Sequence, residues 1–145
     1  MLNTLDYSQV PSDFVHCFKK DCRLADHCLR YQVTPFIPRE RWSVSVINPS
    51  IAGTGDDCRA YLSDTPLIYA YGMDHLFDNL PYAKAREARY AMREHYGKNH
   101  FYRLKRKERC FDPKEQQYVS DLFRRFHIES EPVFDTYREG FRWVK

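Results

Sequence analysis

Four cysteines in the first half of the sequence are the residues best suited to chemistry. Cys17, Cys22 and Cys28 lie within a stretch of 12 residues, and Cys58 follows later, so that the gaps are four, five and 29 residues. Structural zinc sites take three or four thiolates in a tetrahedron, often supplied by short local segments. We therefore predict that Cys17, Cys22, Cys28 and Cys58 bind one metal ion, with zinc as the first candidate.

The residues around these cysteines suit a site rich in thiolates. The loop 53–55 contains two glycines, which tolerate unusual backbone angles, and it could bend the thiolate of Cys58 toward a metal. Lys19, Lys20 and Arg23 lie between the other cysteines. Their positive charges would offset the net negative charge that four thiolates leave around a divalent ion.

The spacing leaves alternatives open. An iron–sulfur cluster fits the first gap and the distant fourth cysteine, as in the C-x4-C-x2-C run of plant-type ferredoxins, but the middle gap here is five residues instead of two. His16 and His27 each adjoin a cysteine, so either could replace one ligand. The four could also be ordinary buried thiols, which is common for free cysteine. We expect the fifth cysteine, Cys110, to be a core residue.

Positive charge is concentrated in the second half of the chain. The net charge is only +3, yet residues 82–109 hold 10 Lys and Arg against 3 Asp and Glu, whereas residues 1–81 hold 7 against 10. We predict a strand over residues 101–110, in which alternating side chains would form one basic face, after a helix with a basic outer surface. The predicted basic residues are Lys84, Arg86, Arg89 and Arg93 on the helix, and Arg103, Lys105, Lys107 and Arg109 on the strand.

Such a surface is typical of nucleic-acid binding, because cations can contact phosphates while neighbouring aromatic rings stack on bases. RNA or DNA is therefore the first candidate partner. Another protein is the alternative partner, and a face that is merely solvated, or that protects an edge strand, is the remaining interpretation. The sequence contains no RNP motif, KH loop or finger with suitable histidine spacing.

Catalytic motifs are missing from the sequence. It has no P-loop, dinucleotide-binding fingerprint, nucleophile elbow or deaminase pattern. A metal with four protein ligands has no open position, which is typical of structural sites. We therefore expect a non-enzymatic binding module.

Composition indicates a folded chain in a reducing compartment. The sequence is 43% hydrophobic and 16% aromatic over 145 residues, unlike a disordered protein. Its start lacks the features of a signal peptide, and no apolar run is long enough to span a membrane. Five cysteines do not suit a fully paired disulfide framework. We expect a cytoplasmic protein with no membrane partner.

The expected fold class is α+β, in one small domain over residues 1–145. Residues 1–66 would form a metal-stapled half with a short helix over 21–31 and a strand over 42–47. Residues 67–145 would form a basic half in the order helix, strand, helix. Pro81 suits the start of the first helix, which Gly97 would end, and Asp112-Pro113 with Glu115 resembles a capping box at the start of the second. Apolar residues at helical spacing predict the inward face of each helix: Ala85, Ala88, Met92 and Tyr96 in the first, and Val119, Leu122, Phe123 and Phe126 in the second. An aromatic tail would add a final strand within 133–144.

A family resemblance rests on a series of short motifs: Cys22, Cys28-Leu29-Arg30-Tyr31, Asn48-Pro49, Cys58, Gly72-Met73-Asp74-His75-Leu76-Phe77-Asp78-Asn79-Leu80-Pro81, Phe101-Tyr102-Arg103, Pro113-Lys114-Glu115-Gln116-Gln117 and Phe134-Asp135-Thr136-Tyr137. The chain resembles an uncharacterised family of small cysteine-containing proteins from Bacteroides-group bacteria, and it departs from that family at Lys107, near which we expect a glycine. The resemblance implies a cytoplasmic bacterial setting and no assigned activity.

Overall fold

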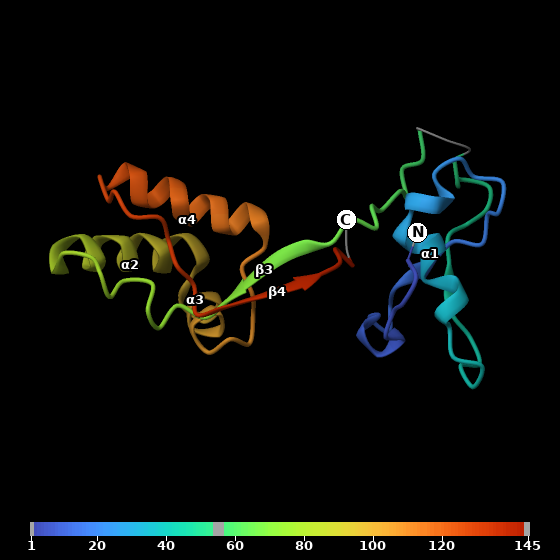
Figure 1. Ribbon diagram of the computed structural model, residues 1–145, viewed down its shortest axis with the longest axis horizontal. Coiled ribbons are helices and arrows are strands. Elements are labelled where there is room, and N and C mark those ends of the chain that lie inside the picture. The colour runs from blue at the N-terminus through green and yellow to red at the C-terminus, as the bar shows by residue number, and fades with distance from the viewer. Residues whose placement is uncertain (1, 54–56, 144–145) are drawn as a thin grey trace. The chain divides into compact units, whose positions relative to one another are not determined.

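The computed structural model describes residues 2–53 and 57–143 (Figure 1). Helices and strands are mixed, which confirms the α+β class. The chain divides into two compact units, Met1–Pro66 with Phe141–Lys145, and Leu67–Gly140. We call these the cysteine unit and the helical unit, and each is described by itself. None of the helices in the described ranges is long and apolar enough to cross a membrane.

The cysteine unit is built from very short elements. Two-residue strands β1 (Val15–His16) and β2 (Ser45–Val46) pair in parallel, and the only α-helix of the described part of this unit is the four-residue α1 (Leu29–Gln32). Three 3-10 helices complete it: η1 (Tyr7–Gln9), η2 (Ala25–His27) and η3 (Thr34–Phe36). Its core cluster is the six buried residues Tyr7, Val10, Phe14, Leu29, Val33 and Leu62.

Two expectations for this unit were wrong in extent. The helix over 21–31 is interrupted at Cys28, whose backbone is extended (φ −101°, ψ 112°) and forms a bridge with Ser63. The strand over 42–47 reduces to β2, and Trp42 is 99% exposed. The alternation of apolar residues there does not bury a face, since Val46 is also 45% exposed, and a strand gains little stability without one.

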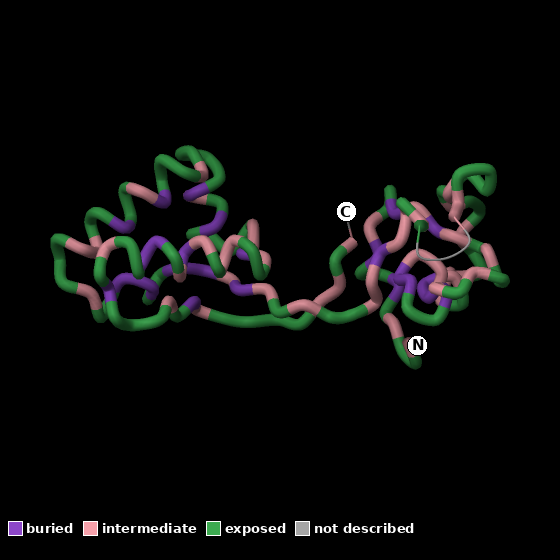
Figure 2. The backbone as a smooth tube through the Cα atoms, turned by 90° about the horizontal axis from the view of Figure 1, so that it is seen from above, coloured by how far each residue is buried: buried purple, intermediate pink, exposed green. Residues whose placement is uncertain are grey.

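The helical unit contains the long elements. Strand β3 (Leu67–Tyr71) pairs antiparallel with β4 (Thr136–Gly140), Leu67 opposite Gly140 and Tyr71 opposite Thr136. Helices α2 (Tyr82–Tyr96), α3 (Lys98–Lys105) and α4 (Pro113–Arg125) lie between these strands in sequence. Fourteen buried residues form one core cluster, and Figure 2 shows buried and exposed positions alternating along the helices.

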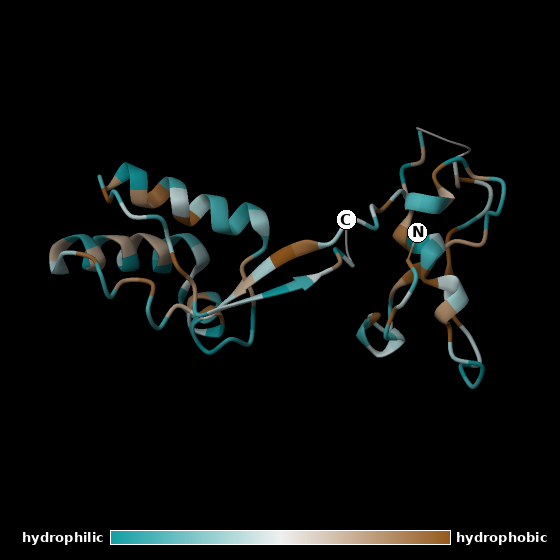
Figure 3. Cartoon of the chain, in the orientation of Figure 1, coloured by the Kyte–Doolittle hydropathy of each residue, from teal (hydrophilic) through white to brown (hydrophobic). Residues whose placement is uncertain are grey.

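The positions of α2 and α4 agree with those predicted from the sequence. Helix α2 buries Ala88 and Met92 as its inward stripe predicts, and apolar positions recur along the helices in Figure 3. At α4 the Asp112 side chain accepts from the Glu115 backbone N–H (2.8 Å), and the Glu115 side chain accepts from the Asp112 N–H (3.1 Å). The capping box is therefore confirmed, as is a final strand within 133–144.

The predicted strand over 101–110 is wrong, because residues 98–105 form α3. Phe101 and Leu104, three residues apart, are 4% and 0% exposed, and this helical spacing outweighs the alternation of cations that suggested a strand. Arg103, Lys105, Lys107 and Arg109 therefore do not share a strand face. Lys107 lies in the turn after α3 with a left-handed backbone (φ 64°), where the family resemblance led us to expect a glycine nearby.

Candidate metal centre and basic surface

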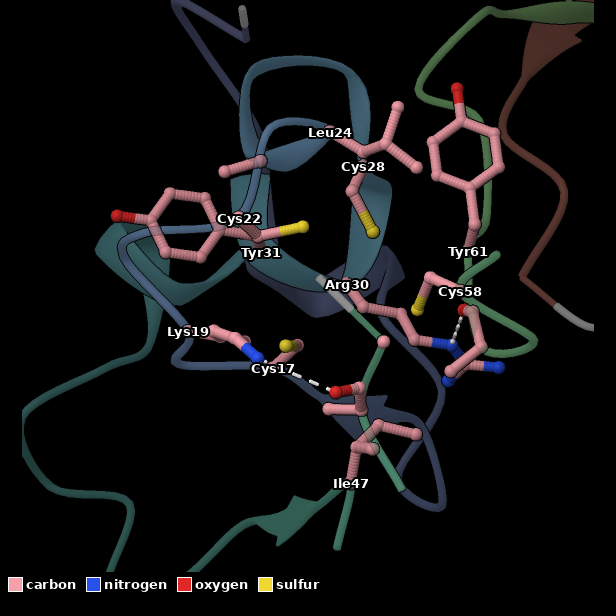
Figure 4. A pocket seen from close by; sticks show the side chains of 14 residues that line it. Cys17, Lys19, Cys22, Leu24, Cys28, Arg30, Tyr31, Ile47, Cys58 and Tyr61 are labelled. Atoms are coloured by element: carbon pink, nitrogen blue, oxygen red, sulfur yellow. Dashed lines mark hydrogen bonds between the residues drawn. The ribbon is translucent and has the colours of Figure 1, made fainter. Parts of the chain in front are cut away.

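All four predicted metal ligands line one cavity of the cysteine unit. Figure 4 shows the sulfur atoms of Cys17, Cys22, Cys28 and Cys58 bordering this space. The cavity has a volume of about 20 Å³. Cys28 is buried, the other three are half-buried, and none of them forms a disulfide. Residues spread over 42 positions of sequence thus meet at one place.

Short elements and turns position the four cysteines. Cys17 follows β1, and its N–H donates to the Arg30 carbonyl (3.0 Å). The Cys22 carbonyl accepts from Ala25 at the start of η2 (3.1 Å). Cys28 is the residue between η2 and α1. Cys58 begins a turn in which its carbonyl accepts from the Tyr61 N–H (3.1 Å).

Arg30 joins the segments that carry three of the cysteines. It lies in α1, two residues after Cys28, and its side chain donates to the carbonyl of Val15 (2.8 Å) and that of Ala60 (2.9 Å). These two carbonyls lie two residues from Cys17 and Cys58, and the second bond is drawn in Figure 4. Sequence reasoning missed Arg30, because its partners are 15 and 30 residues away and no local pattern marks them.

Gly53 allows a close approach of two backbone segments at the cavity. A Cβ placed on Gly53 would lie 2.9 Å from the Cα of Cys58 and 3.1 Å from its nitrogen. The sequence suggested that glycine is needed before Cys58 for unusual backbone angles. At Gly53 the structure shows a different reason, which is that a side chain would collide with the backbone of Cys58. The other glycine of that loop, Gly55, lies outside the described residues.

The cations near the cavity are only partly those expected. Lys19 lines it and donates to the Ala52 carbonyl (3.4 Å), and Arg30 lines it as well. Lys20 and Arg23 are exposed and are not among the lining residues. Two positive side chains therefore border the four thiols.

Neither histidine replaces a cysteine at the cavity. His16 is buried, its Nε2 lies 2.9 Å from the Tyr7 hydroxyl, and its Nδ1 lies 3.1 Å from the Ser45 carbonyl, so both ring nitrogens are engaged. Burial lowers the pKa of His16. The His27 side chain is 72% exposed, 3.9 Å from Asp64. Neither ring lines the cavity.

The side chains do not form a coordination sphere as they stand. Within residues 2–53 and 57–143, no group of three or more His, Cys, Asp and Glu side chains is arranged so that it could hold a metal ion. Metal binding by the four cysteines therefore stays a prediction.

Cys110 belongs to the helical unit and is half-buried rather than a core residue. Burial raises the pKa of Tyr71, and Cys110 beside its hydroxyl raises it further.

The eight predicted basic residues fall into two groups. Lys84 donates to the His127 carbonyl (2.8 Å), Lys107 lies 3.9 Å from Asp135, Arg103 lies 3.9 Å from Glu108, and Arg109 pairs with Glu115 (2.6 Å). The other four form no ion pair with any described residue and are exposed: Arg86, Arg89, Arg93 and Lys105.

Three of these unpaired cations lie on one face of α2. Arg86, Arg89 and Arg93 line the same surface groove. The Arg89 guanidinium lies over the Phe77 ring (5.1 Å to its centroid), and that of Arg93 lies over Tyr102 (5.9 Å). The basic surface is therefore centred on α2, with Tyr102 of α3 beside it.

Comparison with known proteins identifies the family. No curated protein and no solved structure matches the chain. The model of one family, described as a family of unknown function, matches residues 1–143. The Bacteroides origin that the resemblance implied stays a prediction. The chain belongs to the family of unknown function DUF6078.

Proposed function

We propose that this protein is a non-enzymatic binding module that is stabilised by one zinc ion and contacts nucleic acid through its basic surface. The observation that carries the zinc proposal is the common cavity of Cys17, Cys22, Cys28 and Cys58. A volume of about 20 Å³ resembles the space that one water-sized occupant needs. Zinc is preferred over an iron–sulfur cluster because the gap between Cys22 and Cys28 is five residues, whereas the ferredoxin run has two at this place.

The small core of the cysteine unit supports a role for the metal in stability. Its cluster has six buried residues, against 14 in the helical unit, and its α-helix in the described part spans four residues. Units of this size commonly need a disulfide or a metal in addition to their core. All five cysteines are free, so a metal ion is the staple that the residues could supply. It would cross-link the segments around residues 17–28 and 58.

Four thiolate ligands would leave the zinc without an open position. Catalytic zinc keeps a site for water or substrate, whereas a site closed by four protein ligands is structural. The side chains of Lys19 and Arg30 at the cavity would offset part of the charge of the thiolates. This donor set supports a structural ion in a non-enzymatic protein.

Metal analysis of purified protein tests the zinc proposal. We expect about one zinc per chain, no brown colour, and loss of zinc together with lower thermal stability in Cys28→Ser. Cys110→Ser is the matched control, because Cys110 belongs to the other unit, and it should keep the zinc. A wild-type protein without zinc, a visible iron–sulfur absorption, or a Cys28→Ser variant with unchanged zinc and stability would contradict the proposal.

The nucleic-acid part of the proposal is supported by the charge of residues 82–109 and by the unpaired arginines on α2. Free cations that face solvent can neutralise phosphates and release counterions. We expect binding to RNA or DNA that weakens as salt rises. The Arg86→Gln/Arg93→Gln variant should bind less, and Arg124→Gln/Arg125→Gln, which removes the same charge from α4, should bind like wild type. Equal binding by the two variants would contradict the proposal that nucleic acid binds at the basic surface on α2.

Another protein remains the second candidate partner. Large apolar side chains are exposed in the cysteine unit: Trp42 is 99% exposed, Ile51 71% and Phe18 50%. Exposed apolar groups of this kind occur at protein contacts, although single ones are also normal on surfaces. An absence of any nucleic-acid binding at low salt would favour this candidate.

A further inference from the structure

The groove on the helical unit combines arginines with tyrosines. Its volume is about 630 Å³, and α2 supplies most of its lining, with Phe101 and Tyr102 contributed by α3. Residues 82, 86, 89, 90 and 93 lie on one face of α2, because their spacings correspond to whole turns of a helix. Tyr82 and Tyr90 are 83% and 65% exposed. Sequence reasoning missed both tyrosines, although they share a helical face with Arg86.

The exposed rings have no role in the core of the helical unit. Neither Tyr82 nor Tyr90 belongs to the core cluster or to the partly buried residues packed against it. By contrast, Tyr102 is partly buried against the core and has the Arg93 guanidinium over its ring. The groove therefore presents aromatic faces to solvent, with cations held beside them.

Charge favours a polyanion over other occupants. The lining contains Arg86, Arg89 and Arg93 against a single carboxylate, Glu87. Arg89 is held over the Phe77 ring, and a guanidinium in that position can still donate from its edge to a phosphate. The exposed tyrosines add a second requirement, a ligand with flat rings that are free to stack.

These observations together select one kind of nucleic acid. In a duplex the bases already stack on one another, so a duplex would use the arginines and leave the tyrosine rings unused. Single strands expose base faces, and proteins bind them with a basic groove and aromatic platforms. Residues 82–93 extend about 16 Å along the helix axis. A groove of this length accommodates a short stretch of a single strand.

We infer that the groove on α2 and α3 binds single-stranded RNA or DNA, with bases stacked on Tyr82 and Tyr90 and phosphates paired with Arg86 and Arg93. This inference rests on the proposed nucleic-acid function and specifies its ligand. The arrangement is independent of base identity, since every base has a ring face to stack. Binding is therefore tolerant of sequence.

Fluorescence anisotropy on the full chain tests the inference with three probes of equal length: labelled oligo(U), labelled oligo(dT) and a labelled duplex. We expect both single strands to bind at least about tenfold more tightly than the duplex. Tyr82→Ala/Tyr90→Ala should weaken single-strand binding by about tenfold per ring. Arg86→Gln/Arg93→Gln should lower the salt slope by about 1.4, the value for two single-strand phosphate contacts. Trp42→Ala, which removes an exposed ring of the cysteine unit, is the matched control and should change nothing.

Each other outcome has a distinct meaning. Duplex binding as tight as single-strand binding, with an unchanged Tyr82→Ala/Tyr90→Ala variant, overturns the single-strand inference while the proposed nucleic-acid function stands. Competition by poly(glutamate) as effective as that by oligo(U) overturns it too, because the groove would then accept any polyanion. No binding of any probe at low salt overturns both the inference and the proposed nucleic-acid function. Circular dichroism of each variant shows whether its fold is intact.

Discussion

Gly53 and Cys58 approach each other so closely that one added methyl group would separate them. The Cβ of Gly53→Ala would lie 2.9 Å from the Cα of Cys58, and since that contact is with backbone, a segment must move. If Cys58 is a zinc ligand, the substitution moves its sulfur away from the other three. We expect Gly53→Ala to lower zinc affinity and the melting temperature, measured by competition with a chromophoric chelator and by thermal unfolding.

Gly97→Ala provides the control for this substitution. Gly97 has φ 76° and ψ 158°, a region nearly restricted to glycine, yet nothing lies within 4 Å of its added Cβ. This variant should lose about 1–3 kcal/mol of unfolding free energy through backbone strain while keeping its zinc. Equal zinc affinity in Gly53→Ala and wild type would show that the close approach does not position Cys58.

His75 is expected to titrate above the ordinary range of histidine. Its Nδ1 lies 2.7 Å from Asp78, and this hydrogen bond raises the pKa of His75. NMR titration of the imidazole should give a midpoint above about 6.5, and Asp78→Asn should bring it back toward that value. Asp121→Asn, in α4, should leave it unchanged.

The sign of the stability effect follows from this shift. Because folding raises the pKa of His75, the pair stabilises the fold fully below about pH 6.5, and the stabilisation disappears as pH rises through the raised pKa. The His75 side chain is 76% exposed, so solvent screening keeps the effect small. A midpoint that Asp78→Asn does not move would show that the hydrogen bond is not formed in solution.

At the residue scale, the sequence identified residues that are recognised by their type and spacing. It missed residues whose role depends on contacts with residues distant in sequence. The four cysteines were found because thiols at short spacing have few common uses. Arg30 was missed because its role depends on the hydrogen bonds that its side chain donates to the carbonyls of Val15 and Ala60. Four of the eight predicted cations pair with a carboxylate or a backbone carbonyl, which no count of local charge reveals.

At the scale of elements, α4 depends on the capping box at its start. Asp112→Ala removes the acceptor for the Glu115 N–H and should cost about 1 kcal/mol of unfolding free energy. Urea denaturation should show a lower midpoint with an unchanged slope. Lys114→Ala, an exposed position in the first turn, is the control and should stay near wild type. A stable Asp112→Ala variant would mean that core packing alone fixes the start of α4.

The accuracy of the predicted elements followed the number of independent signals. Helices α2 and α4 had both a cap or breaker and an apolar stripe, and both were found. Helix α3 begins directly after Gly97. The sequence indicated Gly97 as the end of α2 but not that a second helix would begin there. The strand over 42–47 had alternation alone, and without a buried face only β2 formed.

At the scale of the whole molecule, the two units differ in the size of their cores. Each core cluster consists of residues from its own unit, six buried residues in one and 14 in the other. The return of Phe141 and Trp143 to the core of the cysteine unit could not be read from the sequence, because no local pattern indicates which unit a tail joins. Contacts between residues so far apart in sequence are determined by tertiary packing.

This asymmetry gives different responses of the units to metal removal. If zinc staples the cysteine unit, a strong chelator under reducing conditions should unfold that unit and spare the helical unit, which contains none of the four predicted ligands. Hydrogen exchange should show faster exchange at the amide of Val33, the C-cap of α1, whose N–H donates to the Leu29 carbonyl (3.1 Å), and unchanged exchange in α2. The Cys28→Ser variant without chelator should reproduce this pattern, and Cys110→Ser should not. Unchanged exchange at Val33 after full removal of metal would show that the six-residue core holds the unit by itself, and loss of protection in α2 would show that the units do not unfold separately.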